Sequence, residues 1–330
     1  MMTVRIIIRR FTLSLVLSLM GACAGQLQGG TLAAASSTLE PAVRILGIAQ
    51  DGGLPHAACS CPRCDAARKD PKLSSPVASI GIVAPSAQKA YLIDASPDII
   101  EQLDALADVR SLENERVDRT PVDGIFITHA HMGHYLGLAH LGFEAINTKS
   151  LPLWASPAMA SFLENNAPWS QLVRLKNLAL RPLSDGDTVA LEDGLTVQAI
   201  KVPHRAEYTD TYAYIIRGPH KSLLYVPDIS PWHQLDRPLS DLLDNVDIAL
   251  VDGTFYSGDE LPGRDTKEIG HPLIVDTMDL LQEKVSSGKL KVLFVHLNHS
   301  NPTLVPDSKE RQAMESRGFQ LGWPGMEFEL

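Results

Sequence analysis

From Val43 onward, short apolar runs alternate with turn residues and helical stretches. Runs of five to eight residues that are rich in Val, Ile, Leu and Tyr favour β-strands, and the chain groups them between predicted helices. The predicted strands are 43–49, 78–84, 89–95, 124–130, 151–156, 187–191, 195–202, 211–217, 221–227, 247–253 and 291–297. The predicted helices are 97–108, 133–147, 156–165, 238–244, 272–287 and 307–316. This order predicts an α/β fold of two packed sheets with helices outside them, in one domain over 43–330.

The first residues have the pattern of an export signal. Three arginines precede an apolar run over 11–20, and the small residues of GACAG follow it. The run is too short for an ordinary membrane span, so the pattern predicts a secretory signal peptide over 1–24. The pattern leaves open cleavage after Ala24 or lipidation of Cys23 at a lipobox-like sequence. The alternative to a signal peptide is a retained anchor or a wrongly assigned start of the chain. Residues 25–42 are small and polar and predict a flexible tether. We therefore expect an exported protein, either periplasmic or lipid-anchored to the outer face of a membrane.

Composition limits the class of partner. The chain has 330 residues, of which 45% are hydrophobic and 21% charged, as in ordinary globular proteins. Its formal net charge of −10 argues against a protein that binds nucleic acid by neutralising phosphates. We expect a small-molecule substrate and no nucleic acid, and nothing in the sequence indicates the oligomeric state.

The strongest chemical pattern is Thr-His-Ala-His-Met-Gly-His over 128–134, which follows a predicted strand. Alternation at the strand end places His129 and His131 on one face, and His134 enters the next helix. Three imidazoles in such a short segment can bind one or two metal ions. The alternative is a surface cluster of histidines, or core histidines bonded to the backbone.

Three further candidate ligands lie at the ends of predicted strands: His204, Asp228 and His296. A single Asp or His at a strand end is usually a turn or capping residue. Together, and in this order, these residues indicate a shared metal centre, in which a carboxylate such as Asp228 can bridge two cations.

These residues resemble a known family. The six candidates, His129, His131, His134, His204, Asp228 and His296, are similar to the successive metal motifs of the metallo-β-lactamase fold superfamily. The resemblance implies an αββα sandwich with the metals at one edge, and it gives Asp94 the role of supporting the metal-binding loops. Segments 47–65, 92–99, 250–262, 269–272 and 295–302 are also similar to pyrroloquinoline quinone biosynthesis protein B-like proteins, with the phosphonate-pathway cyclic phosphodiesterases as more distant relatives.

One position departs from the superfamily pattern His-x-His-x-Asp-His. Gly133 stands where the aspartate ligand of the second metal is usual. The second site then keeps only His134, His296 and the shared Asp228. We expect a tight first site at His129, His131, His204 and Asp228, with a weaker second site. A single metal, a second metal with water in place of the carboxylate, and a different metal such as iron are the possible consequences.

Cys59, Cys61 and Cys64 place three thiols within six residues. Three clustered cysteines cannot all pair with one another, and Cys23 is a poor partner because it lies in or beside the signal segment. Three thiolates and one imidazole would complete a closed tetrahedral zinc site. The resemblance to the phosphodiesterases implies His299 as the fourth ligand. A disulfide remains the alternative in an oxidising compartment.

The resemblance implies a hydrolase in which a metal-bound hydroxide attacks an ester, phosphodiester or lactam-type bond. Zinc lowers the pKa of its water to about 7. We expect one or two zinc ions around Asp228 and one structural zinc, with iron as the alternative catalytic metal. His271 is the candidate acid for the leaving group, and Asp252 either orients it or touches the metal edge. The alternatives are a metal-dependent oxidation in biosynthesis, as in the protein B-like family, and a non-catalytic binding protein with a degenerate site.

Overall fold

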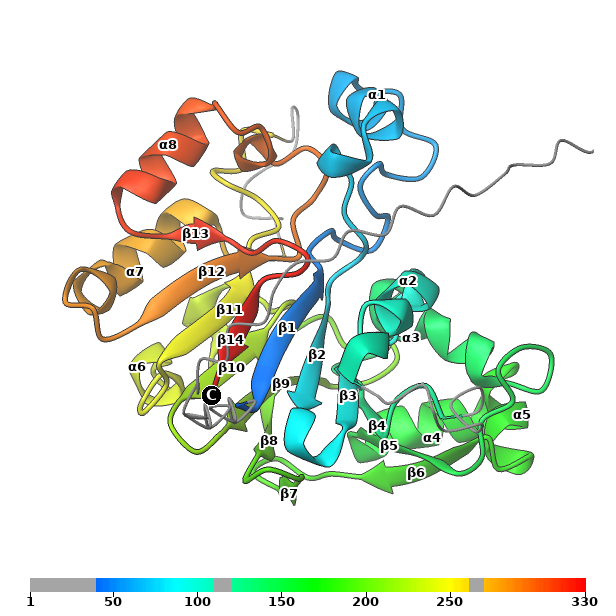
Figure 1. The fold of residues 1–330 in the computed structure, drawn as a ribbon. Helices are drawn as coiled ribbons and strands as arrows, with labels where there is room; N and C mark the ends of the chain where they lie inside the picture. Colours follow the sequence, from blue (N-terminus) through cyan, green and yellow to red (C-terminus); the bar gives the residue numbers. More distant parts are fainter. Residues whose placement is uncertain (1–39, 110–119, 261–269) are drawn as a thin grey trace, which may run out of the picture. The chain divides into compact units, whose positions relative to one another are not determined.

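Two seven-stranded sheets form the centre of the part that the computed structural model describes, residues 40–109, 120–260 and 270–330 (Figure 1). The first sheet has the order β14-β1-β2-β3-β4-β5-β6, with β1 (Ala42–Gly47), β2 (Ser79–Ala84), β3 (Lys89–Ile93), β4 (Gly124–Phe126), β5 (Leu151–Ala155), β6 (Leu178–Pro182) and β14 (Glu327–Glu329). The second has the order β13-β12-β11-β10-β9-β8-β7, with β7 (Thr188–Ala190), β8 (Thr196–Val202), β9 (Thr211–Arg217), β10 (Ser222–Val226), β11 (Ile248–Asp252), β12 (Lys291–Val295) and β13 (Gln320–Leu321).

Strand direction brings the chemically interesting loops to one edge of each sheet. In the first sheet β1 runs antiparallel to β2 and β2 antiparallel to β3, while β3 to β6 run parallel, so β1, β3 and β4 point the same way. In the second sheet β8, β10, β11 and β12 share one direction in the same manner. The loops that leave the carboxyl ends of these strands therefore meet at common edges.

Two apolar layers hold the sheets. One lies between the sheets and includes Ile45, Ile80, Tyr214 and Phe294, all fully buried. This explains why every residue of β2 is buried, because that strand is covered on both faces. The other lies on the outer face of the first sheet, under the helices α2 (Ile99–Asp104), α3 (Met132–Tyr135), α4 (Pro157–Asn165) and α5 (Trp169–Arg174).

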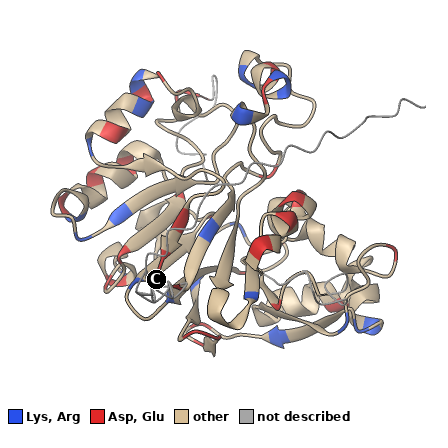
Figure 2. Ribbon diagram, viewed as in Figure 1, with Lys and Arg blue, Asp and Glu red and all other residues tan. Residues whose placement is uncertain are grey.

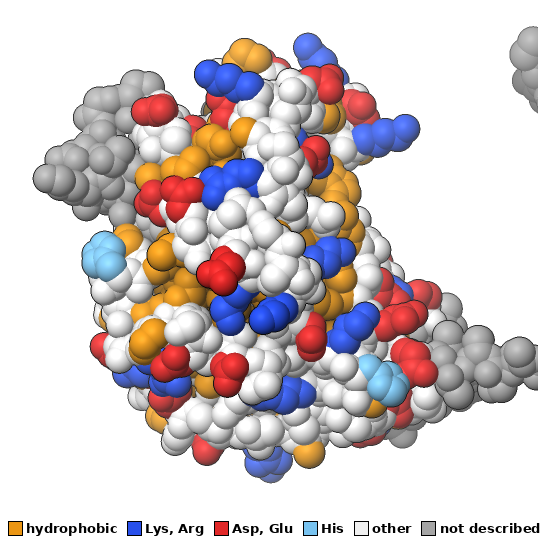
Figure 3. Space-filling view, turned by 90° about the vertical axis from the view of Figure 1, so that its left-hand side faces the viewer, with side chains coloured by type: hydrophobic (Ala, Val, Ile, Leu, Met, Phe, Trp, Pro, Cys, Tyr) orange, Lys and Arg blue, Asp and Glu red, His pale blue; other side chains and the backbone are white. Residues whose placement is uncertain are grey.

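The second sheet has its own outer helices, α6 (Leu239–Leu242), α7 (Ile274–Ser286) and α8 (Lys309–Ser316) (Figure 1). The helix α1 (Pro62–Lys69) begins directly after Cys61 and contains Cys64. The order helix, sheet, sheet, helix confirms the predicted αββα sandwich. Along α1 and α8 acidic and basic residues are intermingled (Figure 2). The face that carries α7 and α8 likewise mixes both signs with hydrophobic side chains (Figure 3).

All eleven predicted strands are present, but several elements were not predicted. β13 and β14 have two and three residues, which is too short for a periodic pattern, and β6 has a half-exposed edge sequence. The helices α1 and α5 were also missed. The helix predicted over 133–147 is wrong in length, because α3 ends at Tyr135 and a 3₁₀ segment follows over Leu136–Leu141.

The predicted signal peptide lies outside the described residues, as does most of the tether, and β1 begins at Ala42, the last residue of that tether. Within the described ranges, none of the helices has the length and apolar character needed to cross a bilayer.

Candidate metal centre

Nine titratable side chains meet where these strand ends converge, and we call them the central cluster. Its members are Asp51, His129, His131, His134, His204, Asp228, Asp252, His271 and His296. All six ligands inferred from the metal motifs belong to it, together with the proposed acid His271. The fold therefore brings together every residue that the sequence assigned to the catalytic metals.

The first half of the central cluster consists of His129, His131, His204 and Asp228. The Nε2 atoms of His129 and His204 each lie 3.2 Å from a carboxylate oxygen of Asp228. His131 Nδ1 lies 3.2 Å from His204 Nε2. Ligand atoms about 2.1 Å from a tetrahedral ion are roughly 3.4 Å from one another. These four side chains therefore have the spacing needed to hold one metal ion.

The second half shares Asp228 with the first. Asp228 Oδ2 lies 3.8 Å from the Nε2 atoms of both His134 and His296. The structure adds a carboxylate that the sequence argument lacked, because Asp51 Oδ1 lies 4.0 Å from His134 Nε2. Asp51 therefore lies beside His134 and His296 in this half, where the sequence argument had placed only His134, His296 and Asp228.

Two threonine hydroxyls orient the rings of His129 and His296. The Nδ1 atoms of His129 and His296 lie 3.0 Å from the hydroxyls of Thr128 and Thr254 respectively. Such contacts on the far ring nitrogen fix the imidazole and leave Nε2 for a metal. Among the described residues, the buried Nε2 atoms of His134 and His296 have no hydrogen-bond partner. Because an unpaired buried polar atom is costly, this arrangement fits a bound cation.

Asp94 supports the segment that carries His129, His131 and His134, as the resemblance implied. It is fully buried and accepts hydrogen bonds from the Thr128 backbone N–H at 2.8 Å and from His134 Nδ1 at 2.7 Å. Both Asp94 and His296 adopt left-handed backbone conformations, with φ of 69° and 59°. For non-glycine residues such conformations cost about 1–3 kcal/mol each and are concentrated at functional sites.

Charge in the cluster is uneven. Burial alone would raise the pKa of Asp228, but the histidines around it, His296 and His271 first, hold that pKa well below its usual range. Burial lowers the pKa of His129 well below its usual value and also lowers that of His296. Burial also lowers the pKa of His134, but Asp94 and then Asp51 outweigh it and raise that pKa to about 9. The cluster thus presents an ionised carboxylate beside neutral imidazoles at His129 and His296, whereas His134 would release a proton when it binds a metal.

His271 is held by the two remaining carboxylates. Its Nδ1 lies 2.9 Å from Asp252 Oδ2 and 3.3 Å from Asp228 Oδ1. Burial lowers the pKa of His271, but Asp252 and Asp228 outweigh it and raise the pKa to about 9. Asp252 also accepts hydrogen bonds from the backbone N–H groups of Ile229 and Thr254. Of the two roles left open for Asp252, this geometry favours orientation of His271.

Solvent reaches two of the cluster's histidines. His131 and His271 are 11% and 10% exposed, whereas the side chains of His134, His204 and His296 are completely buried. Exposed Glu207 accepts a hydrogen bond from His131 Nε2 at 3.0 Å. A substrate would therefore approach past His131 and His271.

A second ligand set, the cysteine cluster, consists of Cys59, Cys61, Cys64 and His299. The three sulfurs lie 3.7, 3.8 and 3.6 Å from His299 Nδ1. A tetrahedral zinc with ordinary bond lengths places sulfur and nitrogen about 3.6 Å apart. All three thiols are free, which argues against the disulfide alternative. The structure thus brings together the four ligands that the sequence and the resemblance indicated.

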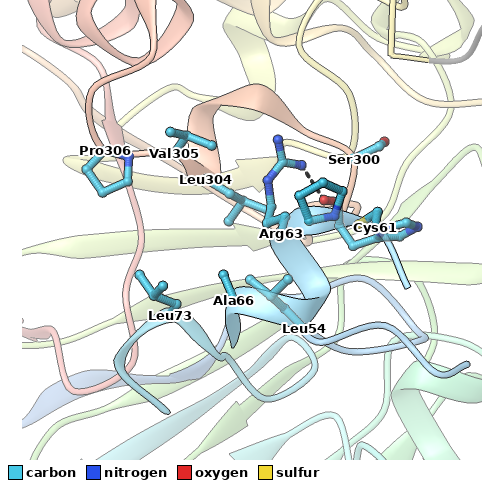
Figure 4. A pocket seen from close by; sticks show the side chains of 11 residues that line it. Leu54, Cys61, Arg63, Ala66, Leu73, Ser300, Leu304, Val305 and Pro306 are labelled. Carbon is cyan, nitrogen blue, oxygen red and sulfur yellow. Dashed lines mark hydrogen bonds between the residues drawn. The ribbon is translucent and has the colours of Figure 1, made fainter. Parts of the chain in front are cut away.

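The cysteine cluster is braced by its neighbours. Arg63 Nη1 donates a hydrogen bond to the His299 carbonyl, and the His56 ring lies 4.5 Å from the His299 ring. Burial raises the pKa of Cys64 to about 11, so its thiolate needs a nearby cation. An apolar cavity borders the cluster, with Cys61 in its wall and Leu54 and Leu304 among its apolar lining (Figure 4). None of the central cluster's residues lines this cavity.

Comparison with known proteins agrees with this architecture. The family model described as "Beta-lactamase superfamily domain" matches residues 89–316. The chain belongs to the metallo-β-lactamase superfamily. It is 29% identical over 315 residues to coenzyme PQQ synthesis protein B of Cupriavidus necator, covering 87% of this chain and 99% of that protein. The corresponding protein of Klebsiella pneumoniae is 27% identical over 311 residues, covering 87% of this chain and 98% of its own.

Solved structures share the fold. The Zn²⁺-bound PqqB of Methylobacterium extorquens superposes with a TM-score of 0.72 at 24% identity, covering 88% of this chain and all of the other. A diphosphatase from the PhnP family superposes with a TM-score of 0.60 at 20% identity, covering 88% of this chain and 98% of the other. These likenesses confirm the sandwich fold that the resemblance implied.

Asp51 is the residue that the sequence argument missed. It lies just beyond the predicted strand 43–49, in a position equivalent to those that drew attention to His204, Asp228 and His296. The direction of β1 relative to β3 and β4 could have indicated it, but only once the sheet order was known.

Proposed function

We propose that this chain is an exported metal-dependent hydrolase that cleaves an ester, phosphodiester or lactam-type bond in a small molecule. The observation that carries the proposal is the convergence of His129, His204 and Asp228 at 3.2 Å beside histidines that solvent can reach. The proposed metal is zinc, with up to two ions in the central cluster and one in the cysteine cluster. Similarity to a zinc-bound structure supports that choice.

When bound, the central ions would make a water nucleophilic at neutral pH and polarise the bond under attack. The chain's own residues would do the rest. Ionised Asp228 would hold both ions in place from a position where its carboxylate is almost fully buried. His271, with Asp252 on Nδ1, would offer a proton from Nε2 to the leaving group.

The surface near the site suits a small substrate. Exposed Arg205 and Glu207 pair at 3.4 Å beside His131, and exposed Tyr208 follows them. Elsewhere, basic and acidic residues alternate along the ribbon of Figure 2, their side chains are mixed on the face in Figure 3, and the net charge is −10. These features support a small-molecule substrate and argue against a polynucleotide.

Export rests on the amino-terminal pattern. The expected mature form begins after Ala24, or at a lipidated Cys23 that would tether the domain to a membrane. Intact-mass measurement of the protein from soluble and membrane fractions distinguishes the two. A mass that includes residues 1–22 in both fractions would contradict export by either route.

A second candidate function has a specific observation in its favour. The chain matches coenzyme PQQ synthesis proteins over nearly their whole length, which supports a metal-dependent oxidation in biosynthesis. Under this alternative the central metal is iron and oxygen is consumed. Turnover by zinc-loaded protein under strict exclusion of oxygen would contradict the alternative and support hydrolysis.

The direct test is a hydrolase screen of the full chain loaded with Zn²⁺. Bis(p-nitrophenyl) phosphate, p-nitrophenyl acetate, a lactone and a β-lactam represent the bond classes. Asp228→Asn is the matched control, because it keeps the side-chain volume and removes the charge. We expect turnover of at least one class by the wild type and none by the variant. Equal rates for both proteins, or metal-loaded wild type without any turnover, would contradict a hydrolase with this site; the second result would favour a non-catalytic binding protein.

A further inference from the structure

The turn after β1 occupies space that a side chain at Gly133 would need. A β-carbon built on Gly133 would lie 2.3 Å from Asp51 Oδ1 and 3.0 Å from the Asp51 Cα. The Gly133 backbone N–H instead donates a hydrogen bond of 2.9 Å to Asp51 Oδ1. Position 133 and the Asp51 carboxylate therefore exclude one another sterically, and glycine is the residue that lets Asp51 enter.

The Asp51 carboxylate lies next to unpaired nitrogen atoms. Asp51, His134 and His296 each offer a ligand atom, and these atoms lie within 4.8 Å of one another. The Nε2 atoms of the two histidines are completely buried and have no hydrogen-bond partner among the described residues. An anionic oxygen facing two unpaired imidazole nitrogens is a donor set suited to a divalent cation.

The position of Asp51 is fixed relative to His296. The Gln50 backbone N–H donates to the Leu297 carbonyl at 2.9 Å, and the Asn298 side-chain amide donates to Gln50 Oε1 at 2.7 Å. These bonds join the turn after β1 to the segment after β12, so that the two ligand-bearing segments form one unit. A ligand held in this way loses little conformational entropy when it binds an ion.

We propose that Asp51 is the carboxylate ligand of the second metal ion, supplied by the turn after β1 in place of an aspartate at position 133. The inference rests on the proposed function, in which the central cluster binds two cations. It also removes the main reason for a degenerate site, because Gly133 then accommodates a relocated ligand. The second site has Asp51, His134, His296 and shared Asp228.

The test exchanges the carboxylate between the two positions. Asp51→Asn keeps the shape and removes the charge, and we expect it to lose one zinc ion per chain, or to bind that ion about 10–100-fold more weakly. Gly133→Asp alone should also disturb the second ion, because the new side chain collides with Asp51. The double variant Asp51→Gly/Gly133→Asp relocates the carboxylate and should recover the second ion.

The readout is zinc per chain by elemental analysis of the full-length protein, with the affinity measured by titration with Zn²⁺ alone. Co²⁺ substitution adds an absorption spectrum that reports the ligands directly. Glu101→Gln is the matched control, because Glu101 is an exposed acid that borders the same surface hollow as Asp51 but not the central cluster. Circular dichroism establishes that each variant is folded.

The outcomes separate this inference from the proposed function. If Asp51→Asn keeps the second ion with the affinity of Glu101→Gln, Asp51 is not a ligand, although the hydrolase proposal stands. If the wild type binds zinc only in the cysteine cluster, the proposed function fails first. Loss of one ion in Asp51→Asn, with recovery in the double variant, supports the relocated ligand.

Discussion

The two ligand clusters share segments of the chain but differ in construction. The cysteine cluster takes four ligand atoms from two short segments, and four is the number that a structural zinc needs. The central cluster takes nine side chains from the carboxyl ends of strands of both sheets and from the segments that follow them, and two of its histidines are partly exposed. A closed ligand set stabilises a fold, whereas an open one with spare coordination positions permits chemistry.

The clusters are also coupled through the chain. Asp51 lies eight residues before Cys59, and His296 lies three residues before His299. The cysteine cluster therefore ties together the two segments that supply Asp51 and His296 to the central cluster. An ion bound in the cysteine cluster would therefore also help to position two ligands of the central cluster.

The largest effect is expected for Asp228, the residue shared by both halves of the central cluster. Asp228→Asn should lose both central ions and reduce activity to background, because one carboxylate contacts both ligand sets. The cysteine-cluster ion should remain, so elemental analysis should find one zinc per chain. Two or more zinc ions in this variant would contradict the shared role.

His129→Ala should remove the first-half ion and the activity while the protein stays folded. His129 contributes a ligand atom to the first half only, 3.2 Å from Asp228. Zinc content should fall by one ion per chain, and circular dichroism should show that the variant is folded. A folded variant with wild-type zinc content would remove His129 from the ligand set.

Cys61→Ala should break the closed cluster and lower stability. An ion present at about 1,000 times its Kd contributes about 4 kcal/mol to the free energy of unfolding. Loss of that amount lowers Tm by roughly 8–16 °C in a domain somewhat smaller than this one. Differential scanning calorimetry with and without added Zn²⁺ measures the effect. An unchanged Tm that still responds to Zn²⁺ as in the wild type would place the structural ion elsewhere.

A smaller effect on metal affinity is expected when a residue that contacts a ligand, but is not itself a ligand, is changed. Thr254→Val removes the hydroxyl that lies 3.0 Å from His296 Nδ1 while keeping the side-chain volume. We expect the second-half ion to bind about 10–100-fold more weakly, with the first-half ion unaffected. Zinc titration resolves the two affinities. Equal weakening of both ions would indicate a general structural defect and not the loss of one supporting contact.

Much of this arrangement could be predicted from the sequence. The strands that carry His129, His204, Asp228 and His296 have long apolar runs, and a ligand directly after such a run lies at a sheet edge by necessity. The cysteine cluster could also be predicted from the sequence, because three of its ligands lie within six residues.

The remainder depends on packing that no local pattern encodes. Asp51 enters the central cluster only because β1 runs parallel to β3 and because the Gly133 backbone leaves room for a carboxylate. β13 and β14 are too short to show a period, and β14 pairs with β1 at the other end of the described chain. The sequence therefore revealed the ligands that lie together in a motif or at the ends of clear strands. It did not reveal Asp51, which comes from a segment distant in the chain and which we propose replaces an aspartate at position 133.

The measurement that tests the central claim most directly is zinc per chain in the wild type, His129→Ala and Cys61→Ala, purified and dialysed together. The account predicts three ions in the wild type and two in each variant, with activity lost in His129→Ala. The same stoichiometry in all three proteins, or no zinc in any of them, would contradict it.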